Sequence, residues 1–427
     1  MTLYLVCFCL FLLLGIPVAI CLGLASLTYL VFTGKLMLLL AFPQKMITGI
    51  DNFVLLTIPF FILAGNLMNS AQLTQYIVRF AQVIVGQIKG GLAAVNLVAS
   101  LMFSGVSGAA TAEASALGSV MIPAMKRDGY RVEYAAALTA VGSLLGPLIP
   151  PSLALILYGV LTGTSIGDLF MAGIFPALLL CALLIAYALY KARVEDHPLP
   201  PVVPADERRG LLWKALPALM LPFIIVGGIK SGIFTPTEAA AVAATYALVI
   251  GLFLYRTLDF QRIRQSFYEA ATMSAGVMLV VAMASMTSFL MSIENIPAQI
   301  AEALMSVTQS PILLLLLLNV ILLVLGLFLE PLAALVLAMP ILNQVFPMLD
   351  VDPVQFGVMV VLNLMIGMVT PPVGLCLFIV STIGRVSLEK VSRAALPPIA
   401  ICVFVLLLVA FVPQLTLLLP KVFGGST

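Results

Sequence analysis

The amino-acid sequence predicts an all-α polytopic membrane protein with about nine crossings, two of them broken helices, and two re-entrant hairpins. First, 63% of the 427 residues are hydrophobic and only 9% are charged, whereas soluble domains are about 45–50% apolar and about 25% charged. Second, uncharged stretches recur that exceed the roughly 20 residues needed to span a bilayer. Third, both halves of the chain contain the same glycine and proline breaks.

Seven apolar runs are predicted to be ordinary crossings. They cover residues 4–31, 53–76, 169–190, 213–230, 236–256, 266–293 and 394–420. The first cation is Lys35, so the first run lacks the basic start of a signal peptide and is expected to be a retained span. Two short stretches of mixed charge, 42–51 and 257–266, are predicted either to lie flat at the membrane surface or to be ordinary loops.

Two longer uncharged runs, 134–167 and 353–384, are each interrupted near the centre. Gly146 and the pair Pro150-Pro151 break the first run, and Gly367 and the pair Pro371-Pro372 break the second. Proline cannot continue a helical hydrogen-bond ladder but suits the first turn of a new helix. Each run is therefore predicted to cross the membrane as two half-helices with an unwound middle.

Residues 91–125 and 311–349 fit no single crossing. Each would form a helix of roughly 50 Å, well beyond a hydrocarbon core of about 30 Å, yet each is too short for two full spans. Glycine or proline lies in the middle of both, at Gly105 and Gly108 in the first and at Gly326 and Pro331 in the second. We expect two hairpins that enter and leave on one face.

This assignment separates the positive charges. Sixteen of the 20 Lys and Arg fall in segments on one side of the membrane, namely 76–90, 126–133, 191–214, 256–265 and 385–393. The four on the other side are Lys35, Lys45, Lys230 and Lys421. Because cytoplasmic loops carry the excess of Lys and Arg, we expect a cytoplasmic N-terminus and an external C-terminus.

The two halves form an inverted repeat. Gly146, Pro150 and Pro151 fall on Gly367, Pro371 and Pro372 at an offset of 221 residues, and Gly105 falls on Gly326. The extra crossing 213–230 makes the second half begin on the opposite side. Inverted repeats with paired broken helices are typical of secondary transporters, in which unwound carbonyls bind a cation and half-helix N-termini attract an anion near the midplane.

Several other functions are disfavoured by the composition. A net charge of +2 argues against nucleic-acid binding. The single histidine, His197, and the absence of any CxxC pair argue against a metal site or a histidine proton relay. No nucleotide-binding motif is present. An enzyme would need a clustered acid pair or an activated nucleophile, and a channel a polar stripe or charged ring, and neither is apparent.

Four motifs resemble those of the large membrane subunit of TRAP (tripartite ATP-independent periplasmic) transporters, and the resemblance extends over essentially the whole chain. The motifs are Ser104–Glu113, Gly146–Pro151, Thr235–Ala241 and Gly367–Gly374. The resemblance implies a sodium-driven elevator transporter that imports an organic anion across a bacterial inner membrane. It also implies two partners, a periplasmic substrate-binding protein and a separate small membrane subunit of four helices. The general similarity favours sialic acid over C4-dicarboxylates, although no single residue decides between them.

The repeat and the resemblance together predict the site residues. The first sodium is expected at Ser104, Ser107 and the carbonyls of Gly146, Ile149 and Pro150, and the second at Gly326, Gly367 and Thr370. The substrate anion is expected between the hairpin tips, with Ser104, Thr111 and Thr370 as polar contacts. Three acids lie deep in apolar runs, Glu113, Glu238 and Glu330, and are expected to cap or pack helices.

By analogy with elevator transporters, residues 90–165 and 310–385 are expected to form the mobile unit. Residues 1–89, 166–309 and 386–427 are expected to form the scaffold, which includes a polar cytoplasmic linker at 191–212. The alternative is a stand-alone sodium/dicarboxylate symporter of related architecture, which needs no binding protein.

Overall fold

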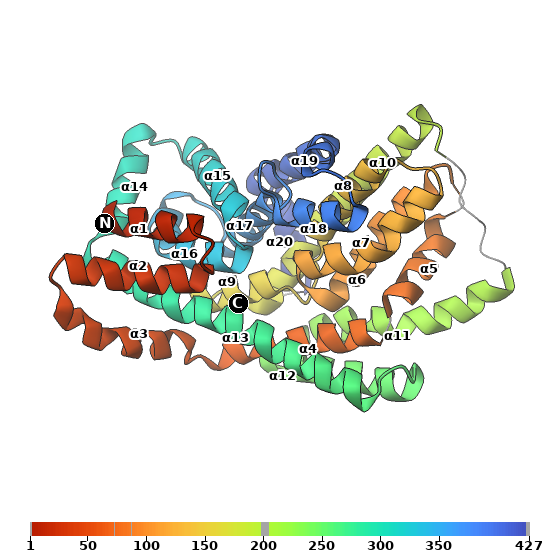
Figure 1. Cartoon of the computed structure of the whole chain (residues 1–427), viewed down its shortest axis with the longest axis horizontal. Coiled ribbons are helices and arrows are strands. Elements are labelled where there is room, and N and C mark those ends of the chain that lie inside the picture. The colour runs from red at the N-terminus through yellow and green to blue at the C-terminus, as the bar shows by residue number, and fades with distance from the viewer. Residues whose placement is uncertain (1, 72, 87, 198–204, 424–427) are drawn as a thin grey trace.

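The computed structural model describes residues 2–71, 73–86, 88–197 and 205–423, and the described chain is folded almost entirely into helices (Figure 1). The first half contains α1 (Thr2–Leu13), α2 (Val18–Phe32), α3 (Ala41–Ile50), α4 (Thr57–Ser70), α5 (Leu73–Val85), α6 (Gly91–Ser107), α7 (Ala110–Arg127), α8 (Val132–Gly142), α9 (Leu153–Thr162) and α10 (Ile166–Val194). The second half contains α11 (Ala205–Lys230), α12 (Pro236–Val249), α13 (Phe260–Ile293), α14 (Ile296–Val307), α15 (Pro311–Phe328), α16 (Pro331–Val345), α17 (Pro353–Gly367), α18 (Leu375–Gly384), α19 (Leu388–Phe411) and α20 (Gln414–Phe423).

Eight helices in the described part of the chain are long and apolar enough to cross a membrane. They lie within the ranges Phe53–Ser70, Ile166–Val194, Gly210–Lys230, Pro236–Leu254, Phe260–Ile293, Pro311–Phe328, Pro331–Met348 and Leu388–Phe411. The four halves of the two broken crossings, α8, α9, α17 and α18, are shorter, as expected for helices that stop in the middle of the bilayer.

The predicted inverted repeat is present in the order of elements. The series from α4 to α10 recurs from α13 to α19 at the same offset in the sequence. In Figure 1 the hairpin α6–α7 lies on the right of the centre and the hairpin α15–α16 on its left, so the two hairpins approach the centre from opposite ends. Gly108 and Ala109 join α6 to α7, and Leu329 and Glu330 join α15 to α16.

Both predicted breaks are confirmed. After α8 a 3₁₀ turn, Ser143–Leu145, leads into irregular chain that ends where α9 begins at Leu153. Ser152 caps α9, since its hydroxyl accepts a hydrogen bond from the N–H of Leu155 at 3.2 Å. In the second half α17 ends at Gly367 and α18 begins at Leu375. The prolines lack the N–H that would continue the helical ladder, and other donors reach some of the carbonyls at the breaks, such as Ser152 Oγ at Pro147 and the Thr370 N–H at Gly367.

The first apolar run, 4–31, is two helices rather than one crossing. Gly15 adopts a φ of 77° and Pro17 precedes α2 as its N-cap residue, so α1 ends and the chain folds back. Tyr4 of α1 packs against Tyr29 and Leu30 near the end of α2. The start of α1 therefore lies at the same end of the molecule as the end of α2 (Figure 1).

Other boundaries differ from the predicted ones. Asp259 caps α13 by accepting a hydrogen bond from the N–H of Arg262 at 2.8 Å, so most of the stretch 257–266 begins a long helix instead of lying flat. The last predicted crossing, 394–420, ends at Phe411 because Pro413 follows, and α20 then packs along α10. The ends of the linker 191–212 belong to α10 and α11, and residues 198–204 lie outside the described residues.

Two amphipathic helices that the sequence analysis missed precede the hairpins. α5 leads into the first hairpin, and α14 occupies the equivalent position before the second. α14 packs mainly on α16 and is linked to α13 by Asn295, whose φ is 53°. Each hairpin is thus joined to a long membrane helix, α4 or α13, through a short helix of its own.

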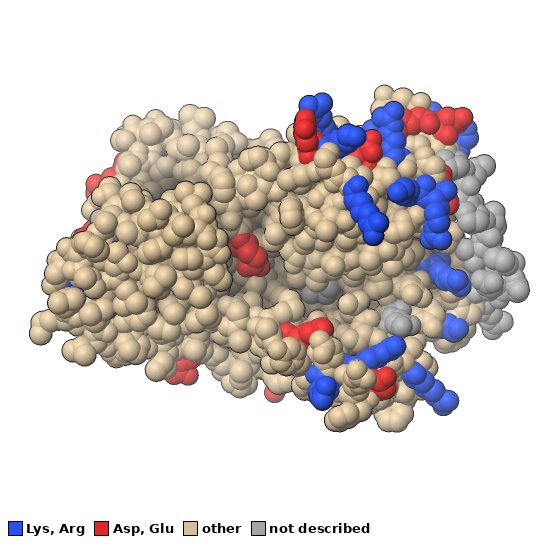
Figure 2. All heavy atoms as spheres, in the orientation of Figure 1, with Lys and Arg blue, Asp and Glu red and all other residues tan. Residues whose placement is uncertain are grey.

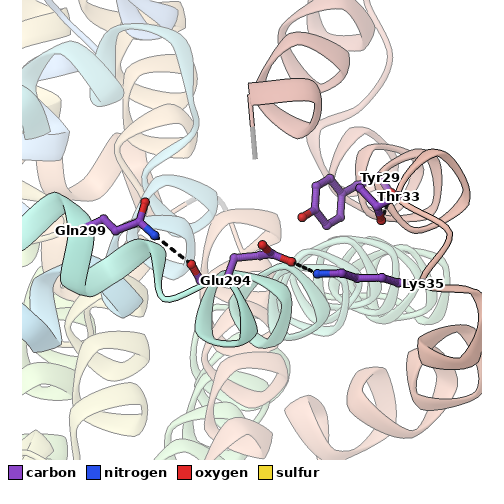
Figure 3. Close-up of polar contacts among 5 residues, drawn as sticks. All are labelled: Tyr29, Thr33, Lys35, Glu294 and Gln299. Atoms are coloured by element: carbon purple, nitrogen blue, oxygen red, sulfur yellow. Dashed lines mark hydrogen bonds and ion pairs between the residues drawn. The ribbon is translucent and has the colours of Figure 1, made fainter.

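The junction of α13 and α14 is tied to α2 by polar contacts (Figure 3). The ammonium of Lys35, just after α2, forms an ion pair with the Glu294 carboxylate. Gln299 donates from Nε2 to the carbonyl of Glu294 at 3.1 Å. These contacts lie at the point where the long helix α13 ends and α14 follows.

Lys and Arg gather at one end of the molecule. Figure 2 shows them concentrated at the right-hand end of this face, over the region where Figure 1 places the ends of α5, α7, α10 and α11, whereas the left-hand part carries few. This is the separation that the sequence analysis predicted for the two membrane faces.

Candidate functional site

The tips of the two hairpins meet between the two broken helices. A cavity of about 30 Å³ lies there. Its lining comes from all four elements and comprises Gly108, Ala109, Ala110, Thr111, Pro147, Leu153, Ala154, Glu330, Pro331, Leu332, Met365 and Met368. A cavity needs about 10–15 Å³ of such space to hold one water molecule, so this one has room for small groups only.

Two helix N-termini border this cavity. α7 begins at Ala110 and α16 at Pro331, directly after the two tips. A helix N-terminus carries unpaired N–H groups and a partial positive charge, which favour an anion. Thr111, a predicted substrate contact, lines the cavity. The exposed acid Glu330 is the N-cap residue of α16.

Three residues around the predicted first sodium site come together. The Ser104 hydroxyl donates to the Ser100 carbonyl at 2.6 Å and lies 3.3 Å from the Glu113 carboxylate. The same carboxylate lies directly against Gly146, where a Cβ would approach its Oε2 to 2.6 Å. Ser104 and Glu113 are fully buried, and neither lines the cavity between the tips.

The predicted second site is built from backbone. A Cβ on Gly367 would lie 2.4 Å from the carbonyl carbon of Gly326, so α15 and α17 touch main chain to main chain. Thr370 donates its hydroxyl to the Ile366 carbonyl at 2.6 Å and does not line the tip cavity. The structure thus brings Gly326 and Gly367 together and places Thr370 one turn beyond them.

The remaining predicted ligands occupy the first break and the first tip. Ser107 ends α6, and its side chain lies outside the described part of the molecule. Ile149 and Pro150 lie in the irregular chain between α8 and α9. The carbonyl of Pro151 lies against the first tip, since a Cβ built on Gly108 would come within 2.2 Å of its oxygen.

Two asparagines of α4 lie beside the first tip and were not predicted. Asn66 and Asn69 line a cavity of about 40 Å³ that shares Ala109 and Leu153 with the cavity between the tips. The Asn66 amide nitrogen is buried and makes no hydrogen bond. The available signal was a pair of asparagines, three residues apart, in a mainly apolar predicted crossing.

A larger cavity of about 630 Å³ lies among α6, α10, α11 and α20 and reaches the first break, where Ile149 and Pro150 line it. Leu101, Met102, Pro222 and Phe223 are part of its almost wholly apolar lining. An anion site needs convergent polar groups, so this cavity is not the candidate site. In the part of the chain that the structure describes, no cluster of three His, Cys, Asp or Glu residues is present.

Two oppositely directed hairpins that meet two broken helices define a class of protein, the multi-pass membrane transporters built from inverted repeats. The family model described as "Tripartite ATP-independent periplasmic transporter, DctM component" matches residues 5–415. The chain belongs to this family and is a transporter permease rather than an enzyme.

Two relatives are similar to this chain along nearly its whole length. The chain is 43% identical over 411 residues to the sialic acid TRAP transporter large permease protein SiaM of Vibrio cholerae, with 96% of each chain covered. It is 36% identical over 431 residues to the C4-dicarboxylate TRAP transporter large permease protein DctM of the same species, covering 96% and 95%.

A third relative is longer. The isethionate TRAP transporter permease protein DctMQ of Oleidesulfovibrio alaskensis is 41% identical over 425 residues, which cover 98% of this chain but 65% of that one. Among solved structures, the YdaH transporter of Alcanivorax borkumensis has a TM-score of 0.63 at 14% identity, with 88% of each chain covered, and shows a similar fold.

Proposed function

We propose that this protein imports an organic acid across a bacterial inner membrane by sodium-coupled secondary transport, in an elevator mechanism. The observation that carries the proposal is the meeting of both hairpin tips with both broken helices around one cavity. Helix N-termini at the tips hold the anion, and oxygens at the two breaks hold sodium ions.

The substrate is a carboxylate, with sialic acid as the first candidate. Similarity to the sialic acid permease, at 43% identity, supports it over the C4-dicarboxylate permease, at 36%. Thr111 at the first tip and Asn66 on α4 supply hydrogen bonds. An amide without a partner next to the cavity suits a substrate rich in hydroxyl groups, because hydroxyls both donate and accept.

Two sodium ions occupy the two halves of the repeat. The first lies near Ser104 and Gly146, and the second near Gly326, Gly367 and Thr370. Support comes from the breaks themselves, where the helical hydrogen-bond ladder stops and irregular backbone lies between the half-helices. Sodium is a hard cation, and backbone carbonyls bind it without a formal charge.

Two partner proteins complete the system. A periplasmic binding protein delivers the substrate, as the name of the family implies. The second partner is a small membrane subunit, which the longer isethionate relative supports, since this chain covers only 65% of it. That relative has room for such a subunit in the same polypeptide.

The basic end of the molecule faces the cytoplasm, because cytoplasmic loops carry the excess of Lys and Arg. In this orientation α1 starts at the external end, next to the end of α2. The expected cytoplasmic N-terminus, which depended on a single crossing at 4–31, is therefore replaced by an external one for α1. The expected external C-terminus falls in residues 424–427, outside the described residues.

The mobile unit contains the hairpins and broken helices, residues 90–165 and 310–385, and the other helices form the scaffold. α5 and α14 connect the two parts, and the φ of 53° at Asn295 gives the second connection a sharp bend. Transport of the anion is coupled to transport of sodium because the mobile unit moves only when both are bound.

Reconstitution tests this function. The chain is placed in liposomes with its small subunit, and uptake of labelled sialic acid and of a C4-dicarboxylate is measured under an imposed sodium gradient. The expected result is accumulation of sialic acid that needs both the gradient and the binding protein. Uptake that needs sodium but no binding protein would favour the stand-alone symporter, and uptake indifferent to sodium would refute the coupling.

A further inference from the structure

A polar cluster occupies the first half of the inverted repeat and has no counterpart in the second. It consists of Ser100 and Ser104 on α6, Glu113 on α7 and Ser143 after α8, all of which are fully buried. At the offset of 221 residues, the equivalent positions carry Ile321, Leu325, Ala334 and Leu364. The fold therefore forms without these polar groups in its second half, and packing alone does not call for them in the first.

Within the cluster, Glu113 lacks a charge partner. No salt bridge in the described part of the chain includes it. Its Oε1 and the Ser100 hydroxyl are both buried without a hydrogen bond of regular geometry, and the hydroxyl lies close enough to the carboxylate to stabilise its charge. A buried carboxylate without a partner is costly unless a cation or a proton neutralises it.

The position of the carboxylate indicates what neutralises it. Its Oε2 lies against Gly146, at the first break, and 3.3 Å from the Ser104 hydroxyl. In the second half, Gly367 is in the same position and touches the backbone of Gly326 instead. In the first half, the Glu113 carboxylate therefore occupies the position that the backbone of Gly326 occupies in the second half.

We infer that Glu113 is the charged ligand of the first sodium ion, with the Ser100 and Ser104 hydroxyls as neutral ligands. The inference rests on the proposed sodium coupling and adds that the two sodium sites differ, because only the first has a charged ligand. One sodium ion would coordinate both of these buried oxygens, which have no hydrogen bond of regular geometry, and would cancel the carboxylate charge. The second site has no acid at the equivalent position, Ala334, so its sodium is held by neutral oxygens and needs the bound anion nearby to bind tightly.

The inference therefore predicts that sodium binds to the first site before the substrate does. The test uses the purified complex of the chain with its small subunit, without substrate, and measures thermal unfolding against sodium concentration. Choline chloride keeps the ionic strength constant. The wild-type complex is expected to gain thermal stability as sodium is added, with a definable midpoint.

The Glu113→Gln variant keeps the shape of the side chain and removes its charge. Its sodium midpoint is expected to rise at least about tenfold, since a charged ligand is worth more than one neutral hydrogen bond. Glu302→Gln, which removes an exposed acid of α14, is the matched control and is expected to keep the wild-type midpoint. If Glu113→Gln does not fold, Ser100→Ala and Glu113→Asp are measured, and both are expected to raise the midpoint by about threefold or more.

An unchanged sodium midpoint in Glu113→Gln overturns the inference, because a proton then neutralises the carboxylate and the amide replaces the protonated acid. If the wild-type complex shows no sodium shift although its uptake is sodium-driven, the inference also fails. If uptake by the wild-type complex needs no sodium, the proposed function fails instead, so the two failures are distinguishable.

Discussion

Gly326 and Gly367 lie backbone against backbone where the second hairpin meets the second broken helix. A Cβ on Gly367 would come within 2.4 Å of the Gly326 carbonyl carbon, and a Cβ on Gly326 within 2.7 Å of the Leu364 carbonyl oxygen. Neither side has a flexible side chain that could move aside. The contact keeps the carbonyls of this break close to the hairpin, as the proposed second sodium site requires.

Gly367→Ala is therefore expected to separate the two elements. Overpacking of this kind costs about 1–3 kcal/mol, so we expect a lower melting temperature and a higher sodium requirement for uptake. Gly276→Ala on α13 is the matched control, because no atom lies within 4 Å of a Cβ built there. Equal behaviour of the two variants in thermal unfolding and uptake would contradict the close contact.

A buried asparagine pair joins the same two elements nearer their outer ends. Asn363 donates to the Asn319 side-chain oxygen at 2.7 Å and to its carbonyl at 2.9 Å. The first half has a similar tie, in which Asn96 donates to the Thr139 hydroxyl at 2.7 Å. Each hairpin is thus bonded to the first half of its broken helix, which favours movement of the two as one unit.

We expect Asn363→Leu to destabilise the protein by about 1 kcal/mol, since buried hydrogen bonds between membrane helices average roughly 0.6 kcal/mol and reach about 1.7. A double-mutant cycle with Asn319→Leu measures the coupling by thermal unfolding. Additive effects of the two substitutions would show that the pair does not hold the hairpin to α17.

Asn66 is expected to contact the substrate from the scaffold side. The amide nitrogen Nδ2 of Asn66 makes no hydrogen bond within the protein. Replacement of Asn66 by Ala should therefore change the stability of the protein little. The KM for uptake should rise about fivefold to tenfold, as for loss of one substrate hydrogen bond of about 1–1.5 kcal/mol. A normal KM in Asn66→Ala, measured with saturating sodium and binding protein, would remove Asn66 from the site.

The ion pair of Lys35 and Glu294 predicts a pH dependence of stability. The hydrogen bond from Lys35, with a second from Tyr29, lowers the pKa of Glu294 below its ordinary value of 4.5. A lowered pKa in the folded state means that the stabilisation is present above pH 4.5 and is lost as the pH falls through the lower folded pKa.

Lys35→Met is accordingly expected to reduce stability at pH 7 by less than about 1 kcal/mol, because both side chains are partly exposed. The difference from wild type should vanish once the pH falls below the lowered folded-state pKa of Glu294. Lys126→Met, which removes a cation that has no salt bridge among the described residues, should show no such dependence. A destabilisation by Lys35→Met that persists at low pH would show that the ion pair is not its cause.

The sequence predicted the breaks and hairpins because their cause is local. Proline at 150, 151, 371 and 372 lacks the N–H that a helix needs, whatever surrounds it. The break at Gly15 and Pro17 has a similar local cause, but the hydrophobic run 4–31 was predicted to be a single span.

Contacts between distant segments were not predictable in this way. The approach of Glu113 to Gly146 depends on how α7 packs against the first break, and the sequence alone suggested helix capping for this acid. The helices α5 and α14 were missed because their apolar faces are short and interrupted by polar residues. Asn66 could likewise be assigned to the site only once the structure placed it beside the first hairpin tip.

The central claim is that the substrate is held between the two hairpin tips, which must separate to admit it. Cysteines at Ala109 on one tip and Leu332 on the other, which line the same cavity, test it by cross-linking in a Cys9→Ser background that lacks the exposed native thiol. We expect a bifunctional cross-linker to abolish uptake only in the double variant, and bound substrate to protect against the reaction. Full uptake by the cross-linked double variant would contradict it.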